Sequence, residues 1–502
     1  MLILLYIAPI LCLLICLIVL KLSAVKTSII SFFITLIIFS IYFKPSIFGA
    51  LISIAKGWSL ALFVILIVCG AMFLYNLVNE AKALDVINKN IEIIINNKFH
   101  QFILLSWAFA PFLQGIAGFG VPIIVVTSIL IALGFEPIKS ACAVLVGHSW
   151  AIAFGSMGSS IYAINMVTQT PISEIIVDMA MFGPIAMFCM GMTVCFIYGG
   201  AKHMLKGLPF ILVISIIMSI SLNILARLGM LSVIGLLTAF SGVIAGFIIS
   251  RIRNNQRGKI DFYSAELNLF QAVLPYILTI ILSVTFFILN PTFTIDFSFQ
   301  GYETLHGQFV PPEEAYVSFN VLKFPFTIIL IASFISMFVF YKKKTFNVPV
   351  AKAVVTKTLK KCIPTSVALL FLVSIAVMMI DSGMIEQIAV SLASATGDVY
   401  PLFAPFIGIL GAFITGSSTN SNIIFGSLQE VAANTLGMST ARMCAAQAIG
   451  ASVGASISPT MIALTIVAAN VQGQESHVYK KIIIPVLITI LILGIANFIL
   501  IS

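Results

Sequence analysis

The chain has 502 residues, of which 61% are hydrophobic and only 9% are charged, and its mean hydropathy is +1.16. This balance excludes a soluble domain, because globular proteins carry about 25% charged residues to cover their surfaces. The net charge of +9 does not indicate a nucleic-acid partner, since the cations lie in loops beside apolar stretches, as the positive-inside rule describes. The composition therefore predicts an all-α polytopic membrane protein whose surroundings are the lipid bilayer.

About twelve apolar stretches reach the length of about 20 residues that a transmembrane helix needs. In chain order they are 2–20, 28–43, 58–79, 140–166, 179–199, 208–226, 231–250, 267–289, 319–341, 363–381, 440–470 and 482–500. The first is predicted to be a span rather than a signal peptide, because no basic region leads its long apolar run. The eight cysteines lie in or beside apolar stretches without a CxxC pair, so they are interpreted as core residues rather than a disulfide or metal framework.

Loop charges predict the side of the membrane that each loop occupies. The loop 290–318 contains acidic residues and no Lys or Arg, whereas basic residues cluster before and after it, at 251–259 and 342–361. The basic loops are therefore predicted to be cytoplasmic, and the acidic loop and both termini external. Four cations depart from this pattern on the outer side: Lys44, Lys56, Arg227 and Arg442.

Two stretches of glycine and small polar residues, 114–120 and 415–422, interrupt the apolar chain. Lipid-exposed irregular backbone is not tolerated at membrane depth, so such stretches must line a protected polar site. We predict two re-entrant hairpins. The hairpin 100–137 enters from the cytoplasm and turns at Gly118-Phe119-Gly120, and the hairpin 400–438 enters from outside and turns near Thr419 to Asn422.

The two interrupted regions look like copies of one unit. One constant shift along the chain places Gly147 on Gly450 and Gly155 on Ser458, and the span after each hairpin is broken by small polar residues, at 154–160 and 454–460. Copies of opposite orientation are a known transporter architecture, with the substrate site at their interface. The predicted division is a first inverted repeat at 1–200, a connecting transmembrane pair at 201–262 and a second inverted repeat at 263–502.

The hairpin tips and the helix breaks form the predicted substrate site. They would bring several helix N-termini toward one point, where free N–H groups and partial positive charge bind anions. Glycines also allow close helix packing, which we favour for Gly134, Gly147 and Gly450, whereas the polar tips favour a ligand site. The predicted substrate-binding residues here are Gln114, Gly115, Gly118, Phe119, Gly120, Gly155, Ser156, Thr415, Gly416, Ser417, Ser418, Thr419, Asn420, Asn422 and Ser458.

Few ionisable residues lie at membrane depth. His148 is the candidate coupling-ion residue, because an intramembrane histidine suits proton exchange; the alternative is a neutral core histidine. Asp381 is interpreted as interfacial. Arg442 and its repeat counterpart Lys139 either reach the membrane interface or supply a cation for a carboxylate, and Arg442 completes the predicted substrate-binding set.

Sequence motifs of enzymes are absent: the chain has no HExxH, Walker A or GxSxG pattern, and these motifs carry the metal, phosphate and nucleophile chemistry of common enzymes. We therefore expect no enzymatic activity, no metal, and no cofactor beyond a coupling proton or sodium ion. The oligomeric state stays open, with a homodimer as one option.

At these motifs the chain resembles the lactate permease family of bacterial and archaeal lactate and glycolate carriers. Two family patterns of the first copy are matched by Gly115, Gly118, Phe119, Gly120 and Pro122, and by Ala153, Phe154, Gly155 and Gly158. Two patterns of the second copy are matched by Phe413, Thr415, Gly416, Ser417, Thr419 and Asn422, and by Ile457, Ser458, Pro459, Ile462 and Ala463. The resemblance covers most of the chain.

Two departures from the family concern coupling. Gln114 stands where the family usually has glutamate, and Ala455 where it usually has lysine. His148 is interpreted as a replacement for the lost titrating group and Arg442 for the lost cation.

The resemblance implies a secondary active transporter of the cell membrane. The expected substrate is a small organic anion, lactate or a related 2-hydroxymonocarboxylate such as glycolate, moved together with protons or sodium. The alternatives are a carrier of dicarboxylates or other organic anions, an uncoupled anion channel that would share the same site, and a membrane enzyme, which the missing motifs disfavour.

Overall fold

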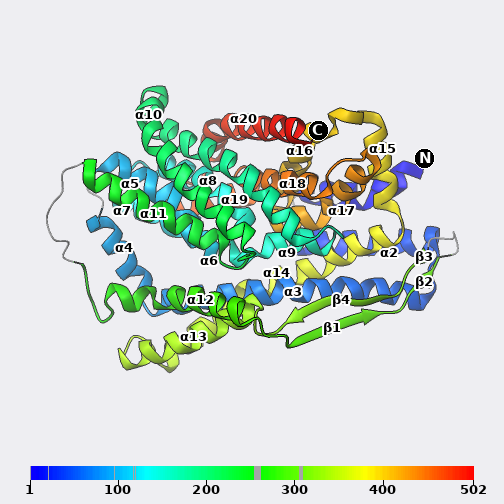
Figure 1. Cartoon of the computed structure of the whole chain (residues 1–502), viewed down its shortest axis with the longest axis horizontal. Coiled ribbons are helices and arrows are strands. Elements are labelled where there is room, and N and C mark those ends of the chain that lie inside the picture. The colour runs from blue at the N-terminus through cyan, green and yellow to red at the C-terminus, as the bar shows by residue number, and fades with distance from the viewer. Residues whose placement is uncertain are drawn as a thin grey trace.

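A computed structural model describes residues 2–20, 22–94, 97–116, 118, 120–253, 262–304 and 309–501. Within these ranges nine helices are long and apolar enough to cross a membrane, or eleven if each of two bent helix pairs is one span. Helices dominate the molecule, and in the described chain strands occur only in the segment from Thr294 to Asn320 (Figure 1). The predicted all-α polytopic fold is therefore confirmed.

The N-terminal half begins with two apolar helices and a long third one. Its elements are α1 (Leu2–Leu14), α2 (Ala24–Ile38), α3 (Ile47–Glu80), α4 (Ala83–Ile94), α5 (Lys98–Leu104), α6 (Ala110–Ile116), α7 (Val121–Ala132), α8 (Pro137–Gly147) and α9 (Ser159–Met166). Short π-helical segments follow α1, α2 and α5, at Ile15–Val19, Phe39–Phe43 and Leu105–Phe109, and two 3₁₀ turns, Ser149–Phe154 and Ser156–Gly158, join α8 to α9. The first predicted hairpin thus consists of α5 to α7.

The middle of the chain contains α10 (Ile172–Arg227), α11 (Ile234–Arg253) and α12 (Leu269–Leu289). Two predicted spans, 179–199 and 208–226, both lie within α10. The backbone leaves helical geometry between them at Gly199 and Gly200, and Gly200 has φ 73°. Glycine tolerates this left-handed conformation because it has no Cβ.

The C-terminal half repeats the order of the N-terminal one. Its elements are α13 (Pro325–Lys342), α14 (Val348–Asp381), α15 (Met384–Thr396), a 3₁₀ turn (Gly397–Leu402), α16 (Ala404–Thr415), α17 (Ser418–Leu436), α18 (Thr440–Ala455), α19 (Pro459–Ala469) and α20 (Glu475–Ile501). Helices α3 and α14 are both 34 residues long. The shift along the chain from the start of α8 to the start of α18 equals the shift from α10 to α20.

Helices α3 and α14 lie side by side and run in opposite directions (Figure 1). Ser53 near the start of α3 contacts Asp381 at the end of α14, and Asn76 near the end of α3 contacts Thr358 near the start of α14. Two equal helices packed in this way are related by a two-fold axis across the pair. This geometry supports the predicted inverted repeat, whose boundaries at residues 200 and 262 stay a prediction.

The acidic loop 290–318 contains strands that the sequence analysis did not predict. Strand β1 (Thr294–Phe299) pairs antiparallel with β4 (Glu313–Asn320), and β2 (Tyr302–Glu303) pairs with β3 (Phe309–Val310). Residues 294–299 alternate polar and apolar side chains, which is the strand period. The strands lie in the same layer as α3 and α12 to α14 (Figure 1).

The second hairpin turns earlier than predicted. Helix α16 ends at Thr415 and α17 begins at Ser418, so the turn consists of Gly416 and Ser417, and the predicted turn residues Thr419 to Asn422 lie in the first turns of α17. Gly416 has φ 70°, and the side chain of Ser417 accepts a hydrogen bond from Asn420 N. This N-cap starts the helix because it satisfies a backbone N–H that has no partner within the helix.

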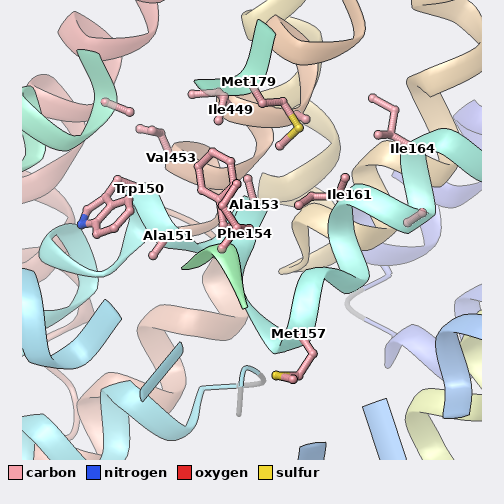
Figure 2. Packing of buried hydrophobic residues seen from close by; sticks show 14 of the residues in the cluster. Trp150, Ala151, Ala153, Phe154, Met157, Ile161, Ile164, Met179, Ile449 and Val453 are labelled. Atoms are coloured by element: carbon pink, nitrogen blue, oxygen red, sulfur yellow. The ribbon is translucent and has the colours of Figure 1, made fainter. Parts of the chain in front are cut away.

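The apolar core between the halves forms where the broken span of the first half meets α18 of the second. Figure 2 shows Trp150 and Phe154 of the first break beside Ile449 and Val453 of α18, with Met179 of α10 above them. All five side chains are buried. The core therefore joins the first helix break to the helix that precedes the second break.

Candidate functional site

The first helix break has an unusual backbone. After α8 ends, Ser156, Met157 and Gly158 follow one another with φ of 47°, 55° and 83°, and α9 then begins at Ser159. Non-glycine residues in this left-handed region cost about 1–3 kcal/mol each, and they persist where the surroundings hold them and often at functional sites. Two such residues in succession show that the break is held by its neighbours rather than by local preference.

The first hairpin tip supplies those neighbours. Gly118 N donates a hydrogen bond to Ser156 Oγ at 3.0 Å. A Cβ on Gly118 would overlap Ser156 Oγ, and a Cβ on Gly155 would lie 2.8 Å from Gln114 Nε2. The structure thus brings together four residues that the sequence analysis assigned to the site: Gln114, Gly118, Gly155 and Ser156.

Three other predicted residues of the first tip have different surroundings. Gly115 lies against the backbone of Leu236 in α11, and Gly120, with φ 79°, lies against the side chain of Leu464 in α19. Phe119 lies outside the described residues. The absence of a side chain at Gly115 therefore serves helix packing, whereas Gly120 brings the first tip to the second half.

The second tip rests on the second break in the same way. A Cβ on Gly416 would lie 2.9 Å from Thr460 Oγ1 and 3.6 Å from Ser458 Oγ. Ser458 caps α19 by accepting a hydrogen bond from Met461 N at 3.2 Å, and Thr415 Oγ1 donates within the tip to the carbonyls of Gly411 and Ser417. Each tip is therefore seated on the broken helix of its own half.

Hydrogen bonds join the two halves beside the tips. Ser160 Oγ lies 2.8 Å from Ser418 Oγ, and Asn422 Nδ2 donates to both the carbonyl and the hydroxyl of Ser160 at 3.0 Å. Asn422 Oδ1 is buried and has no hydrogen-bond partner among the described residues. Buried polar atoms are rarely left without a partner, so such an atom calls for an explanation.

The interface between the halves passes through a pair of equivalent serines. Ser452 Oγ donates to the carbonyl of Ser149 at 2.6 Å and accepts from Ala153 N at 2.8 Å. The shift along the chain from Ser149 to Ser452 is the same as that from α8 to α18. A residue that touches its own repeat counterpart lies close to the axis between the copies. The sequence analysis missed Ser160 and Ser452, although Ser160 ends the predicted break at 154–160.

The groups at the two tips and the two breaks are uncharged, and many of them are hydrogen-bond donors. Helices α7, α9, α17 and α19 all begin at a tip or a break, and a helix N-terminus carries unpaired N–H groups and about half a positive charge. Backbone amides, serine and threonine hydroxyls and the amides of Gln114 and Asn422 surround them. This set can bind the oxygen atoms of a small anion without a cationic side chain.

Arg442, predicted to bind the substrate, lies far from the tips. It stands at the start of α18, donates to the carbonyl of Leu500 and lies 3.7 Å from Asp178 Oδ1. The 16-residue length of α18 separates it from Ser458 by about 24 Å. The structure therefore does not place Arg442 in the predicted site, because the carboxylate of Asp178 on α10 holds its guanidinium at the other end of the helix.

His148 is buried at the end of α8, and its Nδ1 lies 2.6 Å from the carbonyl of Val144. A carbonyl only accepts, so Nδ1 carries a hydrogen and the ring caps its own helix. This geometry fits the alternative of a core histidine, and a coupling role for His148 stays a prediction.

A large cavity that the sequence analysis did not anticipate lies beside α17. Its volume is about 1180 Å³, and the loop between α9 and α10, strand β4, the end of α14, α15 and α17 form its walls. The carboxylates of Glu313, Glu314, Asp381, Glu386 and Glu430 line it. From Ser427, a residue of its wall, α17 leads back to the second tip at Ser418 over about 13 Å. The cavity lies on the side that the loop charges predict to be external.

One wall of this cavity covers a buried ionic cluster. Lys56, only 1% exposed, places its Nζ 3.0 Å from Glu313 Oε1 and 3.9 Å from Asp381 Oδ1. Asp381 Oδ2 accepts hydrogen bonds from Ser53 Oγ at 2.5 Å and from Tyr302 OH at 2.9 Å. Burial and the nearby carboxylate of Asp381 raise the pKa of Tyr302, so its phenol stays protonated and donates. The predicted interfacial Asp381 is thus paired inside the protein.

Comparisons with known proteins identify the family of this chain. A family model described as L-lactate permease matches residues 3–502. The L-lactate permease of Streptococcus iniae is 29% identical over 88% of this chain and 92% of the relative. The glycolate permease of Escherichia coli K12 is 26% identical over 97% of this chain and 93% of the relative, and the L-lactate permease of Bacillus subtilis is 27% identical over 86% and 84%. The chain therefore belongs to the L-lactate permease family.

Proposed function

We propose that this protein is a secondary active transporter that carries lactate or a related 2-hydroxymonocarboxylate such as glycolate across the cell membrane. The observation that carries the proposal is the meeting of two hairpin tips and two helix breaks beside the axis between the halves. A permease family and many apolar helices identify a multi-pass membrane transporter rather than an enzyme. The names of the relatives support lactate or glycolate as the substrate.

The donor set at the tips matches the chemistry of such a substrate. The carboxylate would bind the free N–H groups at the starts of α17 and α19. Asn422 Oδ1, which is buried without a partner among the described residues, would accept the hydrogen of the 2-hydroxyl group. The unpaired oxygen then has a partner only when substrate is bound, which favours hydroxy acids over acids that lack the hydroxyl.

Coupling to a proton gradient, with sodium as the alternative, belongs to the same proposal. The two tips contain no ionisable side chain, so a coupling proton would bind elsewhere. Among the described residues the buried His, Lys and Asp side chains are Lys56, His100, His148 and Asp381, and Asp381 lines the large cavity. His148 remains the predicted candidate for proton binding, and Asp381 is a second candidate because it lines the large cavity.

Transport by the purified protein in liposomes tests the proposal. Labelled L-lactate is expected to accumulate when the outside is acidified or when sodium is added outside, and unlabelled glycolate is expected to compete. Internal lactate should accelerate labelled uptake, because a carrier exchanges substrate and an uncoupled channel does not. The substrate class is contradicted if no short 2-hydroxy acid is taken up and none competes with labelled lactate.

A pair of serine variants on one hairpin and its partner break tests the site. Ser156→Ala removes the acceptor of Gly118 N and leaves a buried donor unpaired, so we expect about tenfold lower kcat/KM for lactate. Ser128→Ala is the control, because this serine on α7 is exposed and, among the described residues, bonds only to the carbonyl of Ile124 in its own helix. Equal effects of both variants would show that the tip contact has no special role.

A further inference from the structure

A groove of about 620 Å³ lies between α10 and α20, away from the tips and the large cavity. Met192 and Phe196 of α10 line it on one side, and Ile484 and Ile488 of α20 line it on the other. The spacing of four residues places each pair on one face of its helix. Phe196, Ile484 and Ile488 are 45%, 62% and 52% exposed, and both helices are long and apolar enough to span the membrane. The groove is therefore open toward the lipid.

One end of the groove is basic. Lys480 and Lys481, near the start of α20, line this end, and within the described residues neither forms a hydrogen bond or an ion pair. Lys202 and Lys206 flank Met204, which also lines the groove. The nearby acid on α20 is Glu475, at the first residue of the helix. The loop charges predict that all these residues lie on the cytoplasmic side.

The dimensions match one leaflet of a bilayer. From Lys481 to Thr489, the last residue of α20 that lines the groove, the helix rises about 12 Å. Half of the hydrocarbon core is about 15 Å thick. The lysines therefore lie at headgroup level when the apolar walls lie among the acyl chains.

We infer that this groove binds an anionic phospholipid of the cytoplasmic leaflet, with an acyl chain between α10 and α20 and the phosphate at Lys480 and Lys481. Apolar walls exclude a soluble polar ligand from the groove. A zwitterionic lipid carries its own cation beside the phosphate, whereas an anionic lipid neutralises lysines that have no partner in the described part of the chain. Basic residues at this side of a membrane protein attract anionic headgroups by about fivefold in affinity for each lysine.

The position of the groove connects the lipid to the transport machinery. Both α10 and α20 pack against α8 and α18, the helices that precede the two breaks. A lipid bridging α10 and α20 would hold these two helices together and so stabilise the breaks. We therefore expect anionic lipid to raise the unfolding temperature of the whole protein.

Lipid binding to the full chain, delipidated in detergent, tests the inference by native mass spectrometry. Phosphatidylglycerol is expected to bind the native protein about 25-fold more tightly than phosphatidylcholine and to raise its unfolding temperature. The variant Lys480→Gln/Lys481→Gln should lose this preference. The control Lys343→Gln/Lys344→Gln should keep it, because that adjacent pair follows α13 on the same predicted side and does not line the groove.

A second variant separates the groove from the lysines. Ile488→Trp narrows the apolar groove, so both lipids should bind about tenfold more weakly although Lys480 and Lys481 remain. Lactate exchange in liposomes verifies that each variant is folded. The inference is overturned if the native protein shows no preference between the two lipids or if both lysine pairs behave alike. It is also overturned if inorganic phosphate displaces the lipid, or if a protein dimer occupies this face instead.

Discussion

The two ends of the α3–α14 pair contain the same ion pair in two environments. Lys56 of α3 approaches Asp381 of α14 at one end, and Lys357 of α14 approaches Glu80 of α3 at the other. Counted from the first residue of each helix, Lys357 occupies the same position in α14 as Lys56 in α3, and Glu80 and Asp381 are the last residues of the two helices. Each helix therefore contains one lysine and one carboxylate at equivalent positions, as the predicted inverted repeat would place them.

The two ion pairs differ in their exposure to solvent. The side chains of Lys56 and Asp381 are 1% and 7% exposed, whereas those of Lys357 and Glu80 are 54% and 17% exposed. Tyr302 of β2 and Glu313 of β4 cover the first pair, and these strands belong to the segment between α12 and α13. Breaking a buried pair leaves an uncompensated charge in a low dielectric, whereas water and salt screen an exposed pair. The two equivalent ion pairs should therefore contribute differently to the free energy of unfolding, because different segments cover them.

Removal of the buried lysine should have the largest effect. Lys56→Met leaves Asp381 without its cation, and we expect a loss of about 3 kcal/mol in the free energy of unfolding. Thermal and denaturant unfolding of the purified protein measure it. The double variant Lys56→Met/Asp381→Asn removes both charges and should recover part of the loss. If the single and double variants are equally unstable, the ion pair is not the cause.

Loss of one hydroxyl from the cover should have an intermediate effect. Tyr302→Phe removes a donor to a charged acceptor, which costs about 1.5–3 kcal/mol. Tyr316→Phe is the control: its ring lies 5.0 Å from Lys56 Nζ, the substitution keeps this ring, and its hydroxyl has no hydrogen bond among the described residues. Similar losses in both variants would contradict a specific role for Tyr302.

The contribution of Tyr302 should also depend on pH in one direction. Its pKa is raised above the ordinary value of 10.0 by burial and by Asp381. The difference in unfolding free energy between the native protein and Tyr302→Phe should therefore be full below pH 10 and shrink only as pH rises further. A difference that disappears between pH 7 and pH 9 would show that the phenol is not the donor in question.

The exposed pair should give the smallest effect. Glu80→Gln removes the acceptor of Lys357, which lies 2.6 Å away, and we expect a loss of at most about 1 kcal/mol that decreases with added salt. Unfolding at low and high ionic strength measures it. A loss as large as that of Lys56→Met would show that burial is not what distinguishes the two ends.

The starts of α3 and α14 show where prediction from local sequence fails. The spans predicted at 58–79 and 363–381 are the apolar parts of α3 and α14, which begin at Ile47 and Val348. Both predicted spans begin later than the helices, because Lys56 and the basic residues before 363 are typical of loops. In the structure Lys56 is inside the protein and paired, and local sequence cannot supply the partner that makes a buried lysine acceptable.

The sequence also predicted some parts of the candidate site and missed others. Glycine and serine spacing correctly predicted the first tip and both breaks, and the structure brings Gln114, Gly118 and Ser156 together. The pattern misplaced the second turn by a few residues because Ser417, rather than a later residue, caps α17. Arg442 was assigned by scarcity of other cations, and its partner Asp178 could not be read from that argument.

The sequence by itself determined the membrane class, the helix breaks and the family resemblance, and it predicted the two hairpins. These follow from apolar runs, glycine positions and a constant offset, all of which are local or periodic properties of the chain. Only the tertiary structure decided that Ser160 meets Asn422, that Ser149 meets Ser452 and that Lys56 is buried beside Asp381 while Lys357 stays exposed. Such contacts join segments that lie far apart along the chain, and their strength depends on the dielectric and the partners that packing creates.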